Sequence, residues 1–122
     1  MVDDNLMAPP AIEVLPSVVA AVKGKVPIFV DSGFRTSTDV VKALCLGASG
    51  VLLGRPALWA LSCGGADGLF TMLDHLQKDI VSDMRSLGAT SLNDLDRTFL
   101  YAPDRERMEK EVATCLQKRG TY

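Results

Sequence analysis

Two short apolar runs, each followed closely by a glycine and an arginine, place the strongest constraint on the fold of this chain. The first run covers residues 26–30 and leads into the loop 31–35, and the second covers residues 51–53 and leads to Gly54 and Arg55. A segment of helix length separates them. Runs that are apolar on both faces are typical of parallel strands covered by helices, and a strand–helix–strand unit makes its strands parallel. The sequence therefore predicts an α/β fold with two arginines at the carboxyl ends of its strands.

The remaining segments read as helices separated by glycine and proline. Apolar residues at spacings of three and four predict a helix at 12–23, and Thr36 and Asp39 have the spacing of a capping box. The further elements expected are a helix from about 37 that ends near Gly47, a short helix at 56–62, a loop at 63–65, a long helix at 67–87, a short turn at 91–95 and a surface helix at about 104–119. Two parallel strands alone would expose unpaired apolar edges, so the sequence looks like part of something larger.

Composition excludes several classes of protein. The 122 residues are 48% hydrophobic and carry a net charge of −2, which suits one globular domain and gives no electrostatic case for nucleic acid or an acidic membrane. No apolar run approaches the ~20 residues of a membrane span, and the acidic start is unlike a signal peptide. The three cysteines form no CxxC pair, so we expect reduced thiols and no metal site. A cytoplasmic location is expected, with a peroxisome or mitochondrion left open.

The loops after the strands carry the candidate chemistry. Glycines beside Arg35 and Arg55 let the backbone approach a ligand, and the short helix after Arg55 points its positive N-terminus the same way. This combination predicts a phosphate site. The alternative is that both arginines only pair with Asp31 or Asp39. For Asp31 the sequence leaves three roles open: a base, an acceptor for a sugar hydroxyl, or a residue that forms the turn.

Three other side chains are expected to be ordinary. His75, the only histidine, falls on the flank of its helix and is read as a surface residue. Leu58 and Trp59 are expected to pack into the core.

At these residues the chain resembles the FMN-dependent α-hydroxy-acid oxidases and dehydrogenases, which include glycolate oxidase, lactate dehydrogenase and flavocytochrome b2. The resemblance covers about residues 8–100 and rests on the ordered stretches 26–35, 38–44, 46–50 and 54–56. It implies the C-terminal part of a TIM (β/α)8 barrel, from helix 6 to helix 8, followed by a helical tail at 101–122. It also implies FMN as cofactor and a small 2-hydroxy acid as substrate.

The resemblance assigns FMN binding to particular residues here. Asp31 would accept hydrogen bonds from ribityl hydroxyls, and Arg35 and Arg55 would meet the phosphate. This chain has Ser32 where the family usually has glycine, so a more strained turn is expected. The complete set implied for FMN is Asp31, Ser32, Gly33, Phe34, Arg35, Gly54 and Arg55.

The family's catalytic histidine lies in a Ser-Asn-His-Gly-x-Arg-Gln stretch that this sequence does not contain. We therefore expect a fragment that supplies the phosphate end of a flavin site and is inactive alone, with no catalytic residue of its own. Two alternatives stay open. One is part of another phosphate-binding barrel, such as inosine monophosphate dehydrogenase. The other is a non-enzymatic half-barrel that forms a homo-oligomer or pairs with a missing N-terminal portion.

Overall fold

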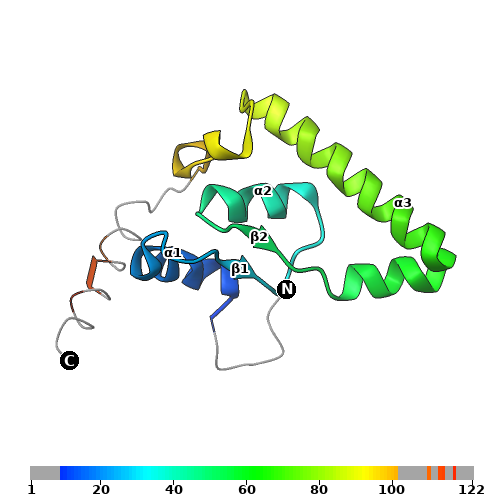
Figure 1. Cartoon of the computed structure of the whole chain (residues 1–122), viewed down its shortest axis with the longest axis horizontal. Helices are drawn as coiled ribbons and strands as arrows, with labels where there is room; N and C mark the ends of the chain where they lie inside the picture. Colours follow the sequence, from blue (N-terminus) through cyan, green and yellow to red (C-terminus); the bar gives the residue numbers. More distant parts are fainter. Residues whose placement is uncertain (1–8, 102–109, 111–112, 115–116, 118–122) are drawn as a thin grey trace.

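The computed structural model describes residues 9–101 together with 110, 113, 114 and 117. Helices and two short strands alternate along the chain before a long bent helix, as Figure 1 shows. The elements are α1 (Ala11–Val22), β1 (Phe29–Val30), α2 (Ser37–Cys45), β2 (Gly50–Val51), α3 (Arg55–Leu87) and the 3-10 turns η1 (Leu92–Asp94) and η2 (Arg97–Phe99). This order confirms the predicted succession of helices and strands. The helix expected at 104–119 lies mostly outside the described residues.

The two strands pair in parallel, as predicted, with Phe29 opposite Gly50 and Val30 opposite Val51. Only one face of β1 is covered by the described residues. Val30 is 6% exposed, whereas its neighbour Phe29 is 62% exposed. The prediction that both faces of this strand are buried is therefore wrong for the described part of the chain.

Both strands are also shorter than the predicted 26–30 and 51–53. Pro27 has no N–H to donate to a ladder, which limits the start of β1. Backbone pairing nevertheless continues one step beyond each end. The Ser49 N–H donates to the Ile28 carbonyl at 2.7 Å, and the Leu52 N–H donates to the Val30 carbonyl at 2.9 Å.

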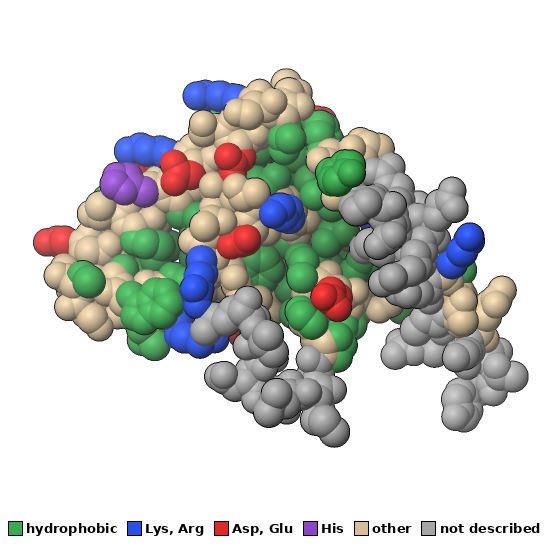
Figure 2. Space-filling view, turned by 180° about the vertical axis from the view of Figure 1, so that it is seen from behind, with side chains coloured by type: hydrophobic (Ala, Val, Ile, Leu, Met, Phe, Trp, Pro, Cys, Tyr) green, Lys and Arg blue, Asp and Glu red, His purple; other side chains and the backbone are tan. Residues whose placement is uncertain are grey.

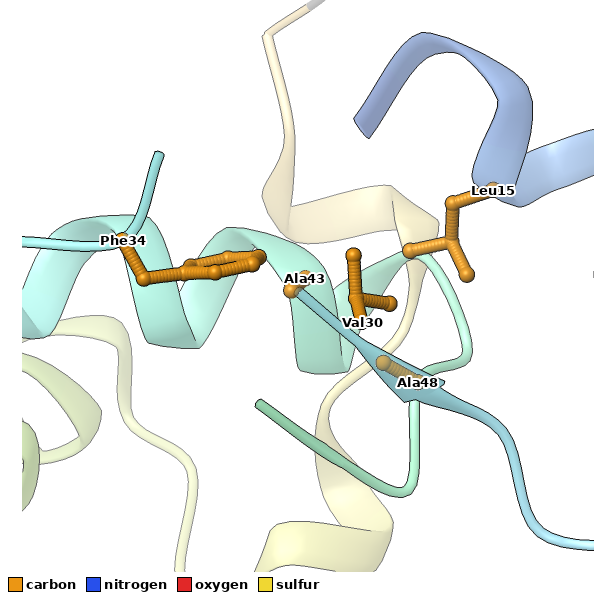
Figure 3. Packing of buried hydrophobic residues seen from close by; sticks show 5 residues of the cluster. All are labelled: Leu15, Val30, Phe34, Ala43 and Ala48. Atoms are coloured by element: carbon orange, nitrogen blue, oxygen red, sulfur yellow. The ribbon is translucent and has the colours of Figure 1, made fainter. Parts of the chain in front are cut away.

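A small apolar core holds β1 against α1 and α2. Its buried members are Leu15, Val30, Phe34, Ala43 and Ala48, which Figure 3 shows gathered around the strand. Phe34 belongs to the loop after β1, so the core anchors that loop. A second cluster joins α2 to the residues after α3, with Val41, Cys45, Ala89 and Leu95 at its centre and Ile80 and Met84 against it.

The long helix α3 is two helices in sequence. Gly64 (φ −146°, ψ 16°) and Gly65 (φ 59°, ψ −145°) are not helical, and the chain turns sharply there in Figure 1. This confirms the predicted short helix, loop and long helix. The two parts pack closely, because a Cβ built on Gly68 would lie 2.5 Å from the Ala60 carbonyl oxygen.

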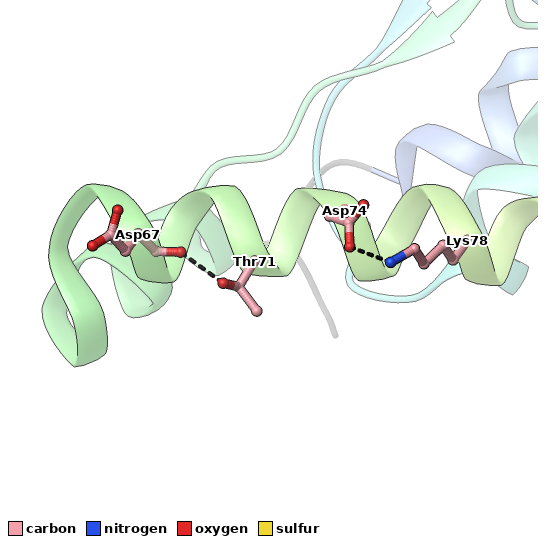
Figure 4. A network of polar contacts seen from close by, with 4 residues as sticks. All are labelled: Asp67, Thr71, Asp74 and Lys78. Carbon is pink, nitrogen blue, oxygen red and sulfur yellow. Dashed lines mark hydrogen bonds and ion pairs between the residues drawn. The ribbon is translucent and has the colours of Figure 1, made fainter.

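The second part of α3 has a polar outer face. There the Thr71 hydroxyl donates to the Asp67 carbonyl at 2.8 Å, and Lys78 pairs with Asp74 at 2.6 Å (Figure 4). No residue of α3 is fully buried by the described part of the chain, so its apolar stripe is only partly covered. Among the described helices, none combines the length and hydropathy that a membrane-spanning segment needs.

Candidate phosphate-binding site

A cavity of about 550 Å³ opens at the carboxyl ends of β1 and β2. Both strand-end loops contribute to it, together with the first turn of α3. Its lining comprises every residue of the predicted FMN set, namely Asp31, Ser32, Gly33, Phe34, Arg35, Gly54 and Arg55, with Leu52, Leu53, Pro56, Ala57 and Leu58. The structure thus brings together residues that are about 20 positions apart in the sequence.

The first loop turns through two residues with positive φ. Ser32 has φ 85° and Gly33 has φ 90°. The Asp31 carboxylate accepts a hydrogen bond from the Ser32 N–H at 2.7 Å, so one of its oxygens forms the turn. Because side-chain-bearing residues disfavour this conformation, Ser32 carries the strain expected where glycine is usual. A Cβ on Gly33 would meet nothing within 4 Å, so this glycine borders open space.

The start of α2 fixes the other end of this loop. Thr36 and Asp39 form the predicted capping box, in which the Thr36 N–H donates to the Asp39 carboxylate at 3.0 Å and the Asp39 N–H donates to the Thr36 hydroxyl at 3.3 Å. The Arg35 N–H also donates to Asp39, at 3.2 Å. Partial burial opposes the charged form, but these hydrogen bonds and nearby Lys42 outweigh it and hold the pKa of Asp39 below its ordinary value. Asp39 therefore fixes the backbone that carries Arg35.

The second loop delivers Arg55 at the start of a helix. Gly54 has φ −96° and ψ −94°, and its carbonyl accepts from the N–H groups of Ala57 at 3.1 Å and Leu58 at 3.4 Å. Arg55 is the first residue of α3, so the Arg55 guanidinium and the positive end of the helix dipole lie at the same rim of the cavity. Arg55 is exposed and has no ion-pair partner among the described residues. The alternative in which it only pairs with Asp31 or Asp39 is not observed.

The expectation that Leu58 and Trp59 pack into the core is wrong. Leu58 is 61% exposed and borders the cavity, and Trp59 is 49% exposed. The Arg35 guanidinium lies over the Trp59 ring, 5.3 Å from its centroid. Both side chains are free of the core because α3 runs out from the strand ends. The sequence carries no local signal for this contact, because Arg35 and Trp59 are 24 positions apart.

The single histidine lies elsewhere. His75 is exposed, as predicted, and borders a neighbouring cavity of about 740 Å³ with Trp59 and Cys63. It does not line the cavity at the strand ends. Within the described part of the chain, no cluster of three or more His, Cys, Asp or Glu side chains could hold a metal ion.

Chemically, the cavity at the strand ends suits an anion that also carries polar groups. It has two guanidinium groups, a helix N-terminus and backbone turned toward open space on one side. The Asp31 carboxylate, at the same rim, offers an acceptor. Figure 2 shows Lys and Arg side chains beside hydrophobic ones on the face turned away in Figure 1.

The fold and this cavity together define a segment of a parallel α/β protein that carries two arginines at its strand ends. The chain belongs, more narrowly, to the FMN-dependent dehydrogenase family, which matches residues 5–102. It is 43% identical to an L-lactate oxidase of Nostoc sp. over 91 residues, which are 75% of this chain and 25% of the relative. It is 47% identical to 2-hydroxyacid oxidase 2 of Rattus norvegicus over 85 residues, 70% of this chain and 24% of that protein.

Solved structures of the same family are similar to this chain as well. A mandelate oxidase with 3,3-difluoro-2-hydroxy-3-phenylpropionic acid matches with a TM-score of 0.71 and 43% identity, covering 74% of this chain and 27% of its own. A flavocytochrome b2 variant with sulfite bound matches with a TM-score of 0.69 and 44% identity, covering 72% and 24%. The chain thus spans about a quarter of the length of the proteins it matches.

These comparisons confirm the family and the fold expected from the resemblance. The structural neighbours are FMN-dependent TIM-barrel enzymes, and the parallel strands and helices described here form part of such a barrel. FMN is the cofactor of the family. The match favours the hydroxy-acid family over the nucleotide dehydrogenase alternative.

Proposed function

We propose that this chain holds the phosphate and ribityl chain of FMN within an enzyme that oxidises a small 2-hydroxy acid to a 2-oxo acid. The observation that carries the proposal is the convergence of the Arg35 loop and the Arg55 helix start on one cavity. The names of the relatives, an L-lactate oxidase and 2-hydroxyacid oxidases, support the substrate class.

Each residue of the site has a physical role in this proposal. Arg35 and Arg55 donate charge-assisted hydrogen bonds to the phosphate, each worth about 1.5–3 kcal/mol. Asp31 accepts hydrogen bonds from ribityl hydroxyls through the carboxylate oxygen that does not bond to the Ser32 N–H. The open space beside Gly33 and Gly54 lets the ligand approach the backbone, since a Cβ at either glycine would meet no other atom. When bound, FMN supplies the electron acceptor for the oxidation.

The chain does not supply the base that this oxidation needs. His75 is the only histidine in the sequence, and it is exposed and lies outside the cavity at the strand ends. We therefore expect no turnover by this chain alone. Glycolate or lactate oxidation by the purified chain with added FMN, above a blank without protein, would show that expectation to be wrong.

The phosphate site is tested by comparing FMN with riboflavin, which lacks the phosphate. We expect the chain to bind FMN more tightly, and we expect the Arg35→Ala/Arg55→Ala variant to lose that preference. Lys78→Ala/Arg85→Ala is the matched control, because it removes the same charge from α3 away from the cavity and should keep the preference. Equal affinity of the unmutated chain for the two flavins would refute the phosphate site.

A second proposal concerns the strand edges. Val26, Phe29 and Leu52 are more than half exposed, although they lie in or beside strands. We propose that further parallel strands of a barrel cover them. Phe29→Lys should then leave the chain's own stability nearly unchanged but prevent pairing with the complementary barrel portion of a relative. Light scattering that shows a dimer of the unmutated chain, disrupted by Phe29→Lys, would instead favour a second copy of the chain at these edges.

The cytoplasmic location stays a prediction.

A further inference from the structure

The contact between Arg35 and Trp59 joins the two halves of the cavity. Arg35 belongs to the loop after β1, and Trp59 belongs to the first part of α3, one turn beyond Arg55. The guanidinium carbon lies 5.3 Å from the ring centroid, within the ~6 Å range of a cation–π contact.

We propose that Trp59 is a positioning residue that holds the Arg35 guanidinium in place for the phosphate of FMN. This inference rests on the function proposed above. Trp59 itself lines the neighbouring cavity and not the one at the strand ends, so it acts through Arg35 and does not contact the phosphate.

The geometry of the guanidinium allows both contacts at once. Its N–H donors all lie in its plane, whereas the aromatic ring engages its face. Stacking on Trp59 therefore does not use these donors. A long exposed side chain loses much rotamer freedom when it binds an anion, and a ring that already restricts Arg35 reduces that loss.

The contact also relates Arg35 to Arg55 in space. Trp59 and Arg55 are on one helix, and their separation of four residues puts them on the same side of it. Fixing Arg35 on Trp59 thus sets its distance from Arg55.

The test measures how strongly each variant prefers FMN to riboflavin. Loss of a cation–π contact at an exposed site should lower FMN affinity about two- to five-fold in Trp59→Leu, with riboflavin affinity unchanged. Trp59→Phe keeps an aromatic face and should recover most of the preference. Leu61→Ala is the control, since Leu61 is an exposed apolar residue of the same helix that lines neither cavity.

The outcomes separate this inference from the function on which it rests. If the unmutated chain binds both flavins equally, the phosphate site itself is refuted. If the unmutated chain prefers FMN, two results would overturn only the positioning role. One is that Trp59→Leu keeps the full preference, and the other is that it lowers the affinity for both flavins equally. In an Arg35→Ala background, Trp59→Leu should have no further effect on the preference, and an additional loss there would also overturn the role.

A second measurement needs no substitution at Trp59. It is the only tryptophan in the sequence, so tryptophan fluorescence reports on the surroundings of this one ring. Titration with inorganic phosphate should change that emission saturably, and Arg35→Ala should abolish the change. Unchanged emission at phosphate concentrations that displace FMN would overturn the inference.

Discussion

Replacing Gly47 with alanine should destabilise the chain by about 2–3 kcal/mol, and the structure attributes this cost to two separate causes. The first is backbone conformation. Gly47 has φ +100°, in the region that residues with a side chain disfavour. This strain costs about 1–2 kcal/mol, of which about 0.4–1 kcal/mol is offset because alanine has less freedom in the unfolded chain.

The second cause is contact with α1. A Cβ on Gly47 would lie 2.9 Å and 3.1 Å from the two methyl carbons of Val19 and 3.6 Å from its Cβ. Rotation about χ1 of Val19 would only move one methyl towards the place of the other, and a helix strongly favours one valine rotamer. Crowding of this kind in a packed region costs about 1–3 kcal/mol.

Gly24→Ala separates the two causes. Gly24 also has a positive φ, +71°, but a Cβ there would meet nothing within 4 Å. It should therefore cost only about 0.5–1 kcal/mol, the strain alone. Removing the methyls of Val19 should reduce the additional cost of Gly47→Ala, which is a coupling measurable in a double-mutant cycle.

The assay is urea unfolding followed by far-ultraviolet circular dichroism. For a chain of this size, about 2 kcal/mol corresponds to a fall in melting temperature of roughly 6–12 °C, so thermal unfolding gives an independent reading. Equal unfolding midpoints for Gly47→Ala and Gly24→Ala would refute the reasoning, because the contact with Val19 would then contribute nothing.

Four further predictions concern the capping box, the thiols and the core. Thr36→Ala should cost about 1 kcal/mol in urea unfolding. The folded protein lowers the pKa of Asp39, so the ionised carboxylate stabilises the fold. This stability is complete at pH values above the ordinary pKa of an aspartate and is lost as the pH falls through the lowered pKa. On acidification, the unfolding midpoint of Asp39→Asn should therefore drop less than that of the unmutated chain. Burial, with the charge of Asp96, raises the pKa of the Cys45 thiol, so an alkylating reagent followed by peptide mass spectrometry should modify exposed Cys63 much faster. Leu15→Ala, which empties a site only 2% exposed, should cost about 2–5 kcal/mol, and a cost below 1 kcal/mol would show that this core is not closely packed.

Much of the local structure followed from short stretches of sequence. The helix predicted at 12–23 is Ala11–Val22, the Thr36–Asp39 capping box forms, and the break at Gly64 and Gly65 is present. These features depend on residues within one or two helical turns of each other, so their determinants are adjacent in the chain. That Arg35 and Arg55 lie close together was predictable for a similar reason, because the carboxyl ends of parallel strands meet at one edge of a sheet. The full set of seven residues came from the resemblance to the family.

The tertiary structure alone decided the features that depend on how distant segments lie. Whether β1 is covered on both faces depends on what packs beside it, and Phe29 is exposed in the described part of the chain. The contact of Arg35 with Trp59 joins residues 24 positions apart and exists because the direction of α3 brings that ring out of the core and beneath the loop. The sequence by itself determined which segments are helices, where they begin and which charges follow the strands. Periodicity and capping are local and leave a pattern in the chain, whereas contacts between elements depend on crossing directions that no local pattern records.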